Sequence, residues 1–135
     1  MPVADSPASD VVIRFTSGFV TETGAVRLGD LAERLAVSPA EFAQATGQTT
    51  ESVSKNFGDE PVRLRHPEAL RVAHELVEVE GLLKALGMSS ERVRKWLRTP
   101  NPSFGGSTPM RLLIQHHGRD LINVLMAMAM GGSGT

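Results

Sequence analysis

Residues 38–53, SPAEFAQATGQTTESV, decide the fold of this chain. Ser38 can cap a helix, Pro39 suits the first helical position, and Glu41 can reach back to close a capping box. Gly47 can adopt the left-handed conformation with which many helices end. This stretch therefore predicts a helix that begins after Ser38 and ends at Gly47.

A second helix is expected directly afterwards, starting at residue 49 or 50 and ending at Asn56. Ala43 is small enough to let two helices approach, Gly47 tolerates a tight turn, and Val53 can pack the second helix onto the first. We therefore predict an Xre-like helix-turn-helix within residues 25–60. The side chains expected to face DNA are Gln48, Thr49, Thr50, Ser52 and Lys55.

The charge of this unit allows a second interpretation. Residues 26–60 contain three Lys or Arg against six Asp or Glu. Much of the affinity of proteins for DNA comes from neutralising phosphates, so an acidic unit would bind weakly as a monomer. The helix-turn-helix could instead serve packing or dimerisation alone.

Helical signals continue on both sides of this unit, whereas strand signals are nearly absent outside residues 11–16, so we predict an all-α fold. The expected helices are residues 26–37, 67–86, a short helix opened by Ser89 or Ser90, one from Thr108-Pro109 to a stop at Gly118, and a last one near 120–130. Residues 1–24 are expected to form a flexible arm and residues 131–135 a flexible tail.

The composition excludes several classes of protein. Cysteine is absent, which excludes disulfides and thiolate metal sites. Neither a signal peptide nor a membrane span is recognisable, so we expect a cytoplasmic protein that does not contact a membrane. The four histidines lack a nucleophile or further ligands. We therefore predict no enzyme activity, no catalytic residue, no metal and no cofactor.

The charge is unevenly distributed along the chain. Residues 1–60 hold four Lys or Arg against nine Asp or Glu, and residues 61–135 hold ten against six. An acidic partner is therefore expected to dock mainly on the C-terminal half, unless these charges are ordinary solvated surface.

The last predicted helix is apolar on every face. Asn123 is the only polar side chain among residues 121–130, and three of the last five are methionine. A terminal helix of a small domain normally leaves one face in water, so this pattern favours contact with a partner, either a second copy or a different protein. The alternative is a helix that is simply well buried.

Residues 94–113, RKWLRTPNPSFGGSTPMRLL, followed by Gly118 and an apolar helix, resemble the toxin-binding domain of Xre/MbcA/ParS-type antitoxins. The elements that carry the resemblance are a Trp-Leu pair, a Pro-Asn pair, a Gly-Gly turn, a Thr-Pro helix start and the glycine before the last helix. The upstream helix-turn-helix is similar in placement to the Xre-like domain of these antitoxins.

The resemblance implies an all-α antitoxin in which the helix-turn-helix precedes a small helical toxin-binding domain at residues 61–130. Its partner would be a RES-type toxin that consumes NAD or uses it for ADP-ribosylation, and whose active site the antitoxin covers. Family members also tend to oligomerise and to repress their own operon. The residues expected to bind the toxin are Trp96, Asn101, Leu121, Val124, Leu125, Met126, Met128 and Met130. The alternative is a DNA-binding transcriptional regulator whose C-terminal half only dimerises.

Overall fold

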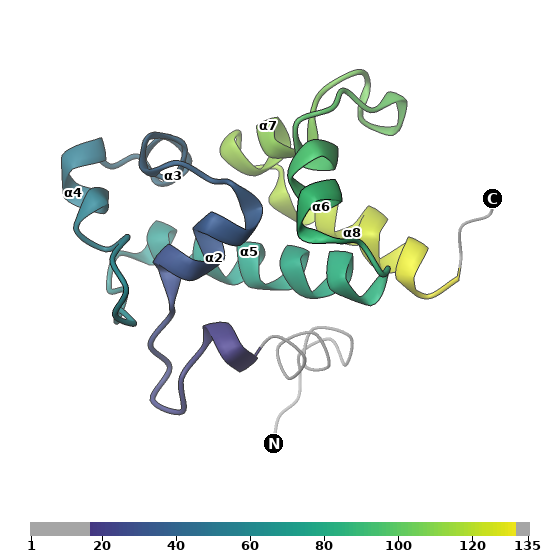
Figure 1. Ribbon diagram of the computed structural model, residues 1–135. Coiled ribbons are helices and arrows are strands. Elements are labelled where there is room, and N and C mark those ends of the chain that lie inside the picture. Colours follow the sequence, from purple (N-terminus) through teal and green to yellow (C-terminus); the bar gives the residue numbers. More distant parts are fainter. Residues whose placement is uncertain (1–16, 132–135) are drawn as a thin grey trace.

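The computed structural model describes residues 17–131 and contains seven α-helices in that range (Figure 1). The only β-structure among them is two isolated bridges, Val20 with Val26 and Val26 with Val62. The predicted all-α fold is therefore confirmed. No helix in this range is long and apolar enough to cross a membrane. The extended segment expected at residues 11–16 lies outside the described residues, as does the tail from residue 132.

The described part of the expected N-terminal arm has defined structure. A 3-10 helix, η1, spans Ser17–Phe19, and Val20 then forms the first of the two bridges. The backbone N–H of Arg27 donates to the carbonyl of Phe19 at 2.8 Å. Phe19 and Val20 also pack against the core. Residues 17–24 are therefore not the free arm that their composition predicted, because apolar contacts and backbone hydrogen bonds hold them.

The helix that the sequence signals most clearly is α3 (Pro39–Thr46), between α2 (Leu28–Leu35) and α4 (Thr50–Ser54). The Ser38 hydroxyl accepts from the Glu41 N–H at 3.1 Å, and the Glu41 carboxylate accepts from the Ser38 N–H at 3.0 Å. Gly47 ends α3 with φ at 71°, in the left-handed region. The capping box and the glycine stop are both confirmed.

The helices α3 and α4 pack together through the residues that the spacing predicted. Ala43 and Val53 are buried, and the Phe42 ring meets Phe57 edge to face with centroids 5.7 Å apart. However, α4 ends at Ser54 rather than at Asn56. The Asn56 N–H donates to the Val53 carbonyl at 2.9 Å, so the helix ends two residues early.

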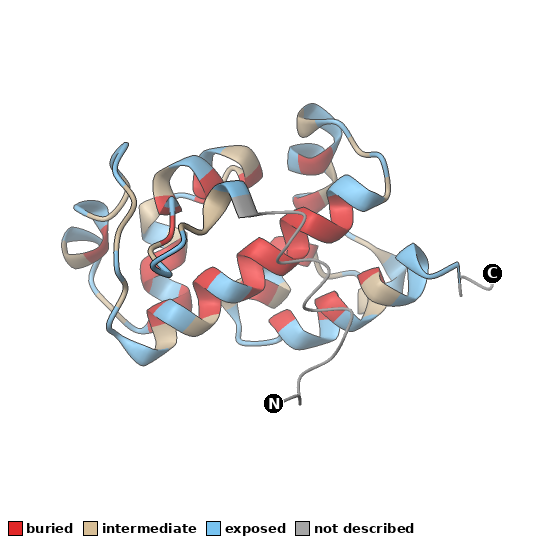
Figure 2. Cartoon of the chain, turned by 90° about the horizontal axis from the view of Figure 1, so that it is seen from below, coloured by how far each residue is buried: buried red, intermediate tan, exposed pale blue. Residues whose placement is uncertain are grey.

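The centre of the molecule is α5 (Pro67–Ala85), the longest helix, which packs against α2 and α3 and against the last helix, α8 (Figures 1 and 2). Its middle is buried all round, as Figure 2 shows. One continuous hydrophobic cluster includes residues from α2 through α8. The two units expected at 25–60 and 61–130 therefore share a single core, because α5 supplies apolar side chains to both.

The C-terminal part consists of α6 (Ser90–Leu97), the 3-10 helix η2 (Pro102–Phe104), α7 (Pro109–Ile114) and α8 (Gly118–Ala129). Ser89 caps α6, and Thr108 caps α7 by accepting from the Arg111 N–H at 3.1 Å. Both caps are in the positions that the sequence predicted.

The sequence predicted that Gly118 ends α7. Instead, Gly118 is the first residue of α8. The chain between the two helices turns at His116, whose φ is 67°. A Cβ at Gly118 would collide with the carboxylate of Glu75, and it would lie 3.3 Å from a Leu113 methyl. This glycine therefore gives α8 room to approach the Glu75 side chain of α5, and its backbone is not in the left-handed region.

Candidate functional site

The helix α8 divides into a buried part and an exposed end. Leu121, Ile122 and Leu125 have no solvent exposure. Met128 is 42% exposed and Met130, just beyond the helix, is 76% exposed. Both are among the few large apolar side chains that the described residues leave in water. The end of α8 is therefore the part of this helix that can contact a second molecule.

Two residues predicted to bind the partner are in the core instead. Leu121 and Leu125 lie one helical turn apart on the face that packs against the chain's own helices, so neither can reach a partner while the chain keeps this fold. Val124 and Met126 are half-buried, and Met126 packs against the core. Of the residues predicted on α8, Met128 and Met130 are thus the exposed pair.

Trp96 and Asn101 have different roles. Trp96 is half-buried and lines a hollow of about 340 Å³ together with Met88, Arg92, Lys95 and Thr99. Asn101 orders the loop before α7: its side-chain oxygen accepts from the Ser103 N–H at 2.9 Å, and its carbonyl accepts from the N–H groups of Phe104 and Gly106. Asn101 therefore shapes the loop, whereas Trp96 contributes surface.

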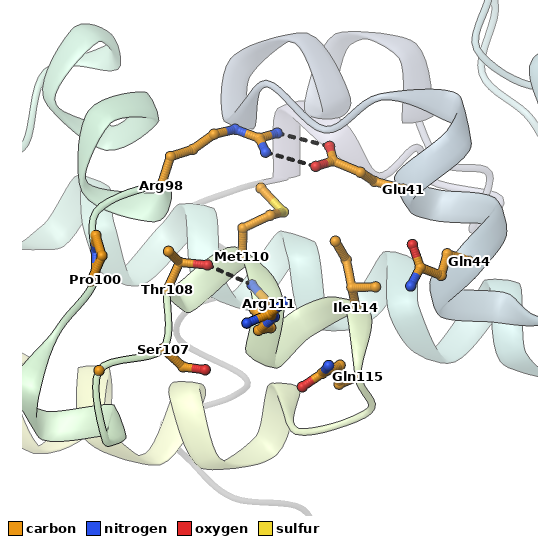
Figure 3. A pocket seen from close by; sticks show the side chains of 11 residues that line it. Glu41, Gln44, Arg98, Pro100, Ser107, Thr108, Met110, Arg111, Ile114 and Gln115 are labelled. Atoms are coloured by element: carbon orange, nitrogen blue, oxygen red, sulfur yellow. Dashed lines mark hydrogen bonds and ion pairs between the residues drawn. The ribbon is translucent and has the colours of Figure 1, made fainter.

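A cleft of about 480 Å³ opens between α3, the end of α6 and α7 (Figure 3). Its walls are mostly polar. They come from two segments that are distant in the sequence, residues 41–44 and residues 98–115. The residues that line it are Glu41, Gln44, Arg98, Pro100, Gly106, Ser107, Thr108, Met110, Arg111, Ile114 and Gln115. The sequence did not predict this cleft, because its two sides meet only in the folded chain.

An ion pair closes one side of this cleft. The two terminal nitrogens of Arg98 donate to the two carboxylate oxygens of Glu41, each at 2.7 Å (Figure 3). One of these nitrogens also donates to the Ala36 carbonyl at 2.6 Å. The hydrogen bonds from Arg98 hold the pKa of Glu41 below its usual range. This bidentate, charge-assisted ion pair thereby joins the predicted helix-turn-helix to α6.

Three glutamates of α5 are buried, and each meets an arginine. Glu75 pairs with Arg71 at 2.8 Å within α5. Glu78 and Glu80 pair with arginines of other helices, namely Arg119 of α8 and Arg34 of α2, each at 3.2 Å. The latter two pairs tie α8 and α2 to opposite sides of α5.

Glu75 lies in the middle of α5 and is 5% exposed. Burial raises its pKa, although Arg71 acts in the opposite direction. Its Oε1 atom, which faces Gly118, has no hydrogen-bond partner. Among residues 17–131 no group of His, Asp and Glu could hold a metal ion.

Residues 75–131 match the family model for the antitoxin Xre/MbcA/ParS C-terminal toxin-binding domain. Residues 75–131 therefore form a toxin-binding domain of the Xre/MbcA/ParS antitoxin family. The matched range begins within α5 and ends just after α8, so it contains the Trp96 hollow and the exposed methionines.

The fold of this antitoxin is also similar to a solved one. A chain in the crystal structure of the M. tuberculosis MbcT-MbcA toxin-antitoxin complex matches with a TM-score of 0.59 and 20% sequence identity. The match covers 78% of this chain and 92% of that chain. At this identity the likeness concerns the fold. No sequence among curated proteins matches the antitoxin.

The residues of the antitoxin predicted to face DNA are only partly free. The Thr49 hydroxyl caps α4 by accepting from the Ser52 N–H at 3.1 Å, and the Gln48 side chain accepts from the Thr46 hydroxyl at 2.9 Å. Thr50 and Lys55 are exposed. The polar groups of Gln48 and Thr49 thus already have partners in the fold.

Proposed function

We propose that this antitoxin neutralises a RES-type toxin, one that consumes NAD or uses it for ADP-ribosylation, by covering the toxin's active site. The observation that carries the proposal is the exposed apolar end of α8, Met128 and Met130, within the family's toxin-binding domain. The solved structure with the similar fold is, by its title, a complex of a toxin with its antitoxin. We propose that the two proteins meet in the cytoplasm.

The way in which α8 is anchored supports occlusion as the mechanism. Leu121, Ile122 and Leu125 fix the helix in the core, so its last turn is held in one direction before binding. A preformed apolar tip loses little conformational entropy when it enters a cleft. Covering apolar surface contributes about 25 cal/mol per Å². The antitoxin would thus act by occupying space and would need no chemistry of its own, so we propose that it is not an enzyme.

The basic character of the C-terminal half supports the same partner. Arg92 and Lys95 flank the half-buried Trp96 in its hollow. An apolar hollow with two cations at its edge fits an acidic segment that carries an apolar side chain. We propose this hollow as a second, outer contact with the toxin.

The experiment that tests this function is co-expression with the toxin encoded beside the antitoxin gene. The full chain should restore growth and copurify with the toxin. A chain ending at Ala127 should do neither, since it lacks both exposed methionines but keeps the buried anchors of α8. A cut after Gly118 would be uninformative because it removes those anchors and would unfold the protein. Absence of any complex with the full chain would overturn the proposal.

We further propose that the antitoxin represses its own operon through α3 and α4. The predicted helix-turn-helix packing carries this part, together with exposed Thr50 and Lys55. Because the unit is acidic, repression would require two or more copies on one operator, and we propose a homo-oligomer. If the protein forms a dimer and binds operator DNA but no toxin, it is a DNA-binding transcriptional regulator whose C-terminal half only dimerises.

A further inference from the structure

The sulfur of this chain is present only in thioethers. The sequence has six methionines and no cysteine. Among the described residues, solvent exposure differs steeply between them: Met110 is 2% exposed, Met88 and Met126 are half-buried, Met128 is 42% exposed and Met130 is 76% exposed. Among the methionines of residues 17–131, an oxidant in the solvent therefore reaches those at the end of α8 first.

The distribution of residue types along α8 follows the same division. The buried anchors are leucine and isoleucine, and sulfur begins only where the helix emerges from the core, at Met126. Leucine would supply the same apolar surface at the exposed end. Methionine differs from it in being flexible and in being reversibly oxidisable.

We propose that Met128 and Met130 are an oxidation site through which peroxide weakens the hold of the antitoxin on its toxin. The inference rests on the proposed function, because it places the modified atoms in the toxin interface. In each reaction the thioether sulfur attacks one oxygen of hydrogen peroxide. The S–O bond forms as the O–O bond breaks. The sulfur loses two electrons, and the departing hydroxide takes the proton of the newly sulfur-bound hydroxyl, which leaves a sulfoxide and one water molecule.

The change acts on binding and leaves the fold intact. A sulfoxide is a strong hydrogen-bond acceptor, and placing it in an apolar cleft without a donor is unfavourable. We expect toxin affinity to fall about tenfold or more for each sulfoxide. The core is unaffected, because its methionine, Met110, is buried and neither exposed sulfur belongs to the core.

The test begins with the free full-length protein treated with limiting hydrogen peroxide. Among the methionines of residues 17–131, mass spectrometry should find sulfoxide first at Met130, then at Met128, and last at Met110. The oxidised protein should bind the toxin encoded beside it at least tenfold more weakly than the reduced protein, and methionine sulfoxide reductase should restore the affinity. The Met128→Leu/Met130→Leu variant should have the same toxin affinity before and after peroxide treatment, because its exposed end of α8 carries no sulfur. The matched control, Met110→Leu, should remain peroxide-sensitive.

Several results would overturn the inference. One is full oxidation of Met128 and Met130 without a change in affinity. Another is equal loss of affinity in the leucine variant, which would place the damage elsewhere. If the reduced protein fails to bind the toxin, the proposed function is wrong and the effect on binding falls with it. The order in which the methionines are oxidised can be measured without the toxin. Failure of the proposed oxidation site and failure of the proposed function can therefore be told apart.

Discussion

The guanidinium of Arg98 holds the carboxylate of Glu41 by two hydrogen bonds of 2.7 Å, although the two residues are 57 positions apart in the sequence. Glu41 is also the residue that closes the capping box of α3 with Ser38. The start of the predicted helix-turn-helix is therefore tied to the end of α6, just before the loop that leads into α7. The contact joins the expected DNA-facing and toxin-facing parts of the molecule.

Replacing Arg98 by alanine should lower the free energy of unfolding by about 1 kcal/mol at pH 7, since the pair is two-pronged but partly exposed to solvent and salt. Because Arg98 lowers the pKa of Glu41 in the folded state, the stabilisation is fully present above the ordinary pKa of a glutamate, about 4.3. It is lost as the pH falls through the lower folded value. Urea unfolding of both proteins from pH 7 to pH 3 should show the two curves converging at acid pH. A difference that stays constant over this range would contradict the assignment.

The opposite pH trend is expected at Glu75. Burial raises its pKa in the folded protein, so stability from this group is present at low pH and is lost as the pH rises through the raised value. Glu75→Gln cannot titrate. Its free energy of unfolding relative to the native protein should therefore rise between pH 4 and pH 7, as measured by urea unfolding at each pH. A relative stability that falls over this interval would show that the Arg71 ion pair outweighs burial.

Gly118→Ala should lower the free energy of unfolding by about 1–3 kcal/mol, because the added methyl group collides with the Glu75 carboxylate inside a packed core. The matched control is Gly58→Ala, since a methyl group there meets no atom within 4 Å. Its effect should remain within about 0.5 kcal/mol. Thermal unfolding of the two variants side by side measures the contrast. Equal effects would mean that α8 does not need this close approach to α5.

The local rules of helix capping predicted most of the element starts. Ser38, Ser89 and Thr108 each cap the helix that they were expected to open, because a cap depends on residues only three positions away. The lengths of α4 and α7 were less well predicted. After α4 the Asn56 N–H bonds back to the Val53 carbonyl, and after α7 the chain turns at His116 with a positive φ, a conformation for which its sequence gives no signal.

The site was harder to predict than the fold. A helix that is apolar on every face does not reveal which face will be buried, so Leu121 and Leu125 were grouped with exposed Met128 and Met130. The cleft beside Arg98 depends on pairing between distant segments, which no spacing along the chain encodes. The function of Gly118 was misread for the same reason, because close packing against α5 leaves no local signal.

Lys55→Ala should weaken binding to the antitoxin's own upstream DNA, if the exposed lysine after α4 contacts a phosphate. The slope of log affinity against log salt should become shallower by about one unit. Thr50→Ala, which removes a neutral exposed hydroxyl, should leave the salt slope unchanged. Binding isotherms at several salt concentrations measure both variants. Unchanged affinity and slope for Lys55→Ala would remove this residue from the DNA-binding face.

The most direct test of the proposed occlusion is a titration of the NAD consumption that we propose for the toxin, with the antitoxin and with its Met128→Ala/Met130→Ala variant. Truncating two apolar contacts should cost about 2 kcal/mol or more of binding, a loss of about thirtyfold in affinity. Circular dichroism should show an unchanged fold, because neither side chain belongs to the core. We predict stoichiometric inhibition by the native antitoxin and inhibition at least thirtyfold weaker by the variant. Equal inhibition by the two proteins, or none by the native one, would contradict occlusion by the end of α8.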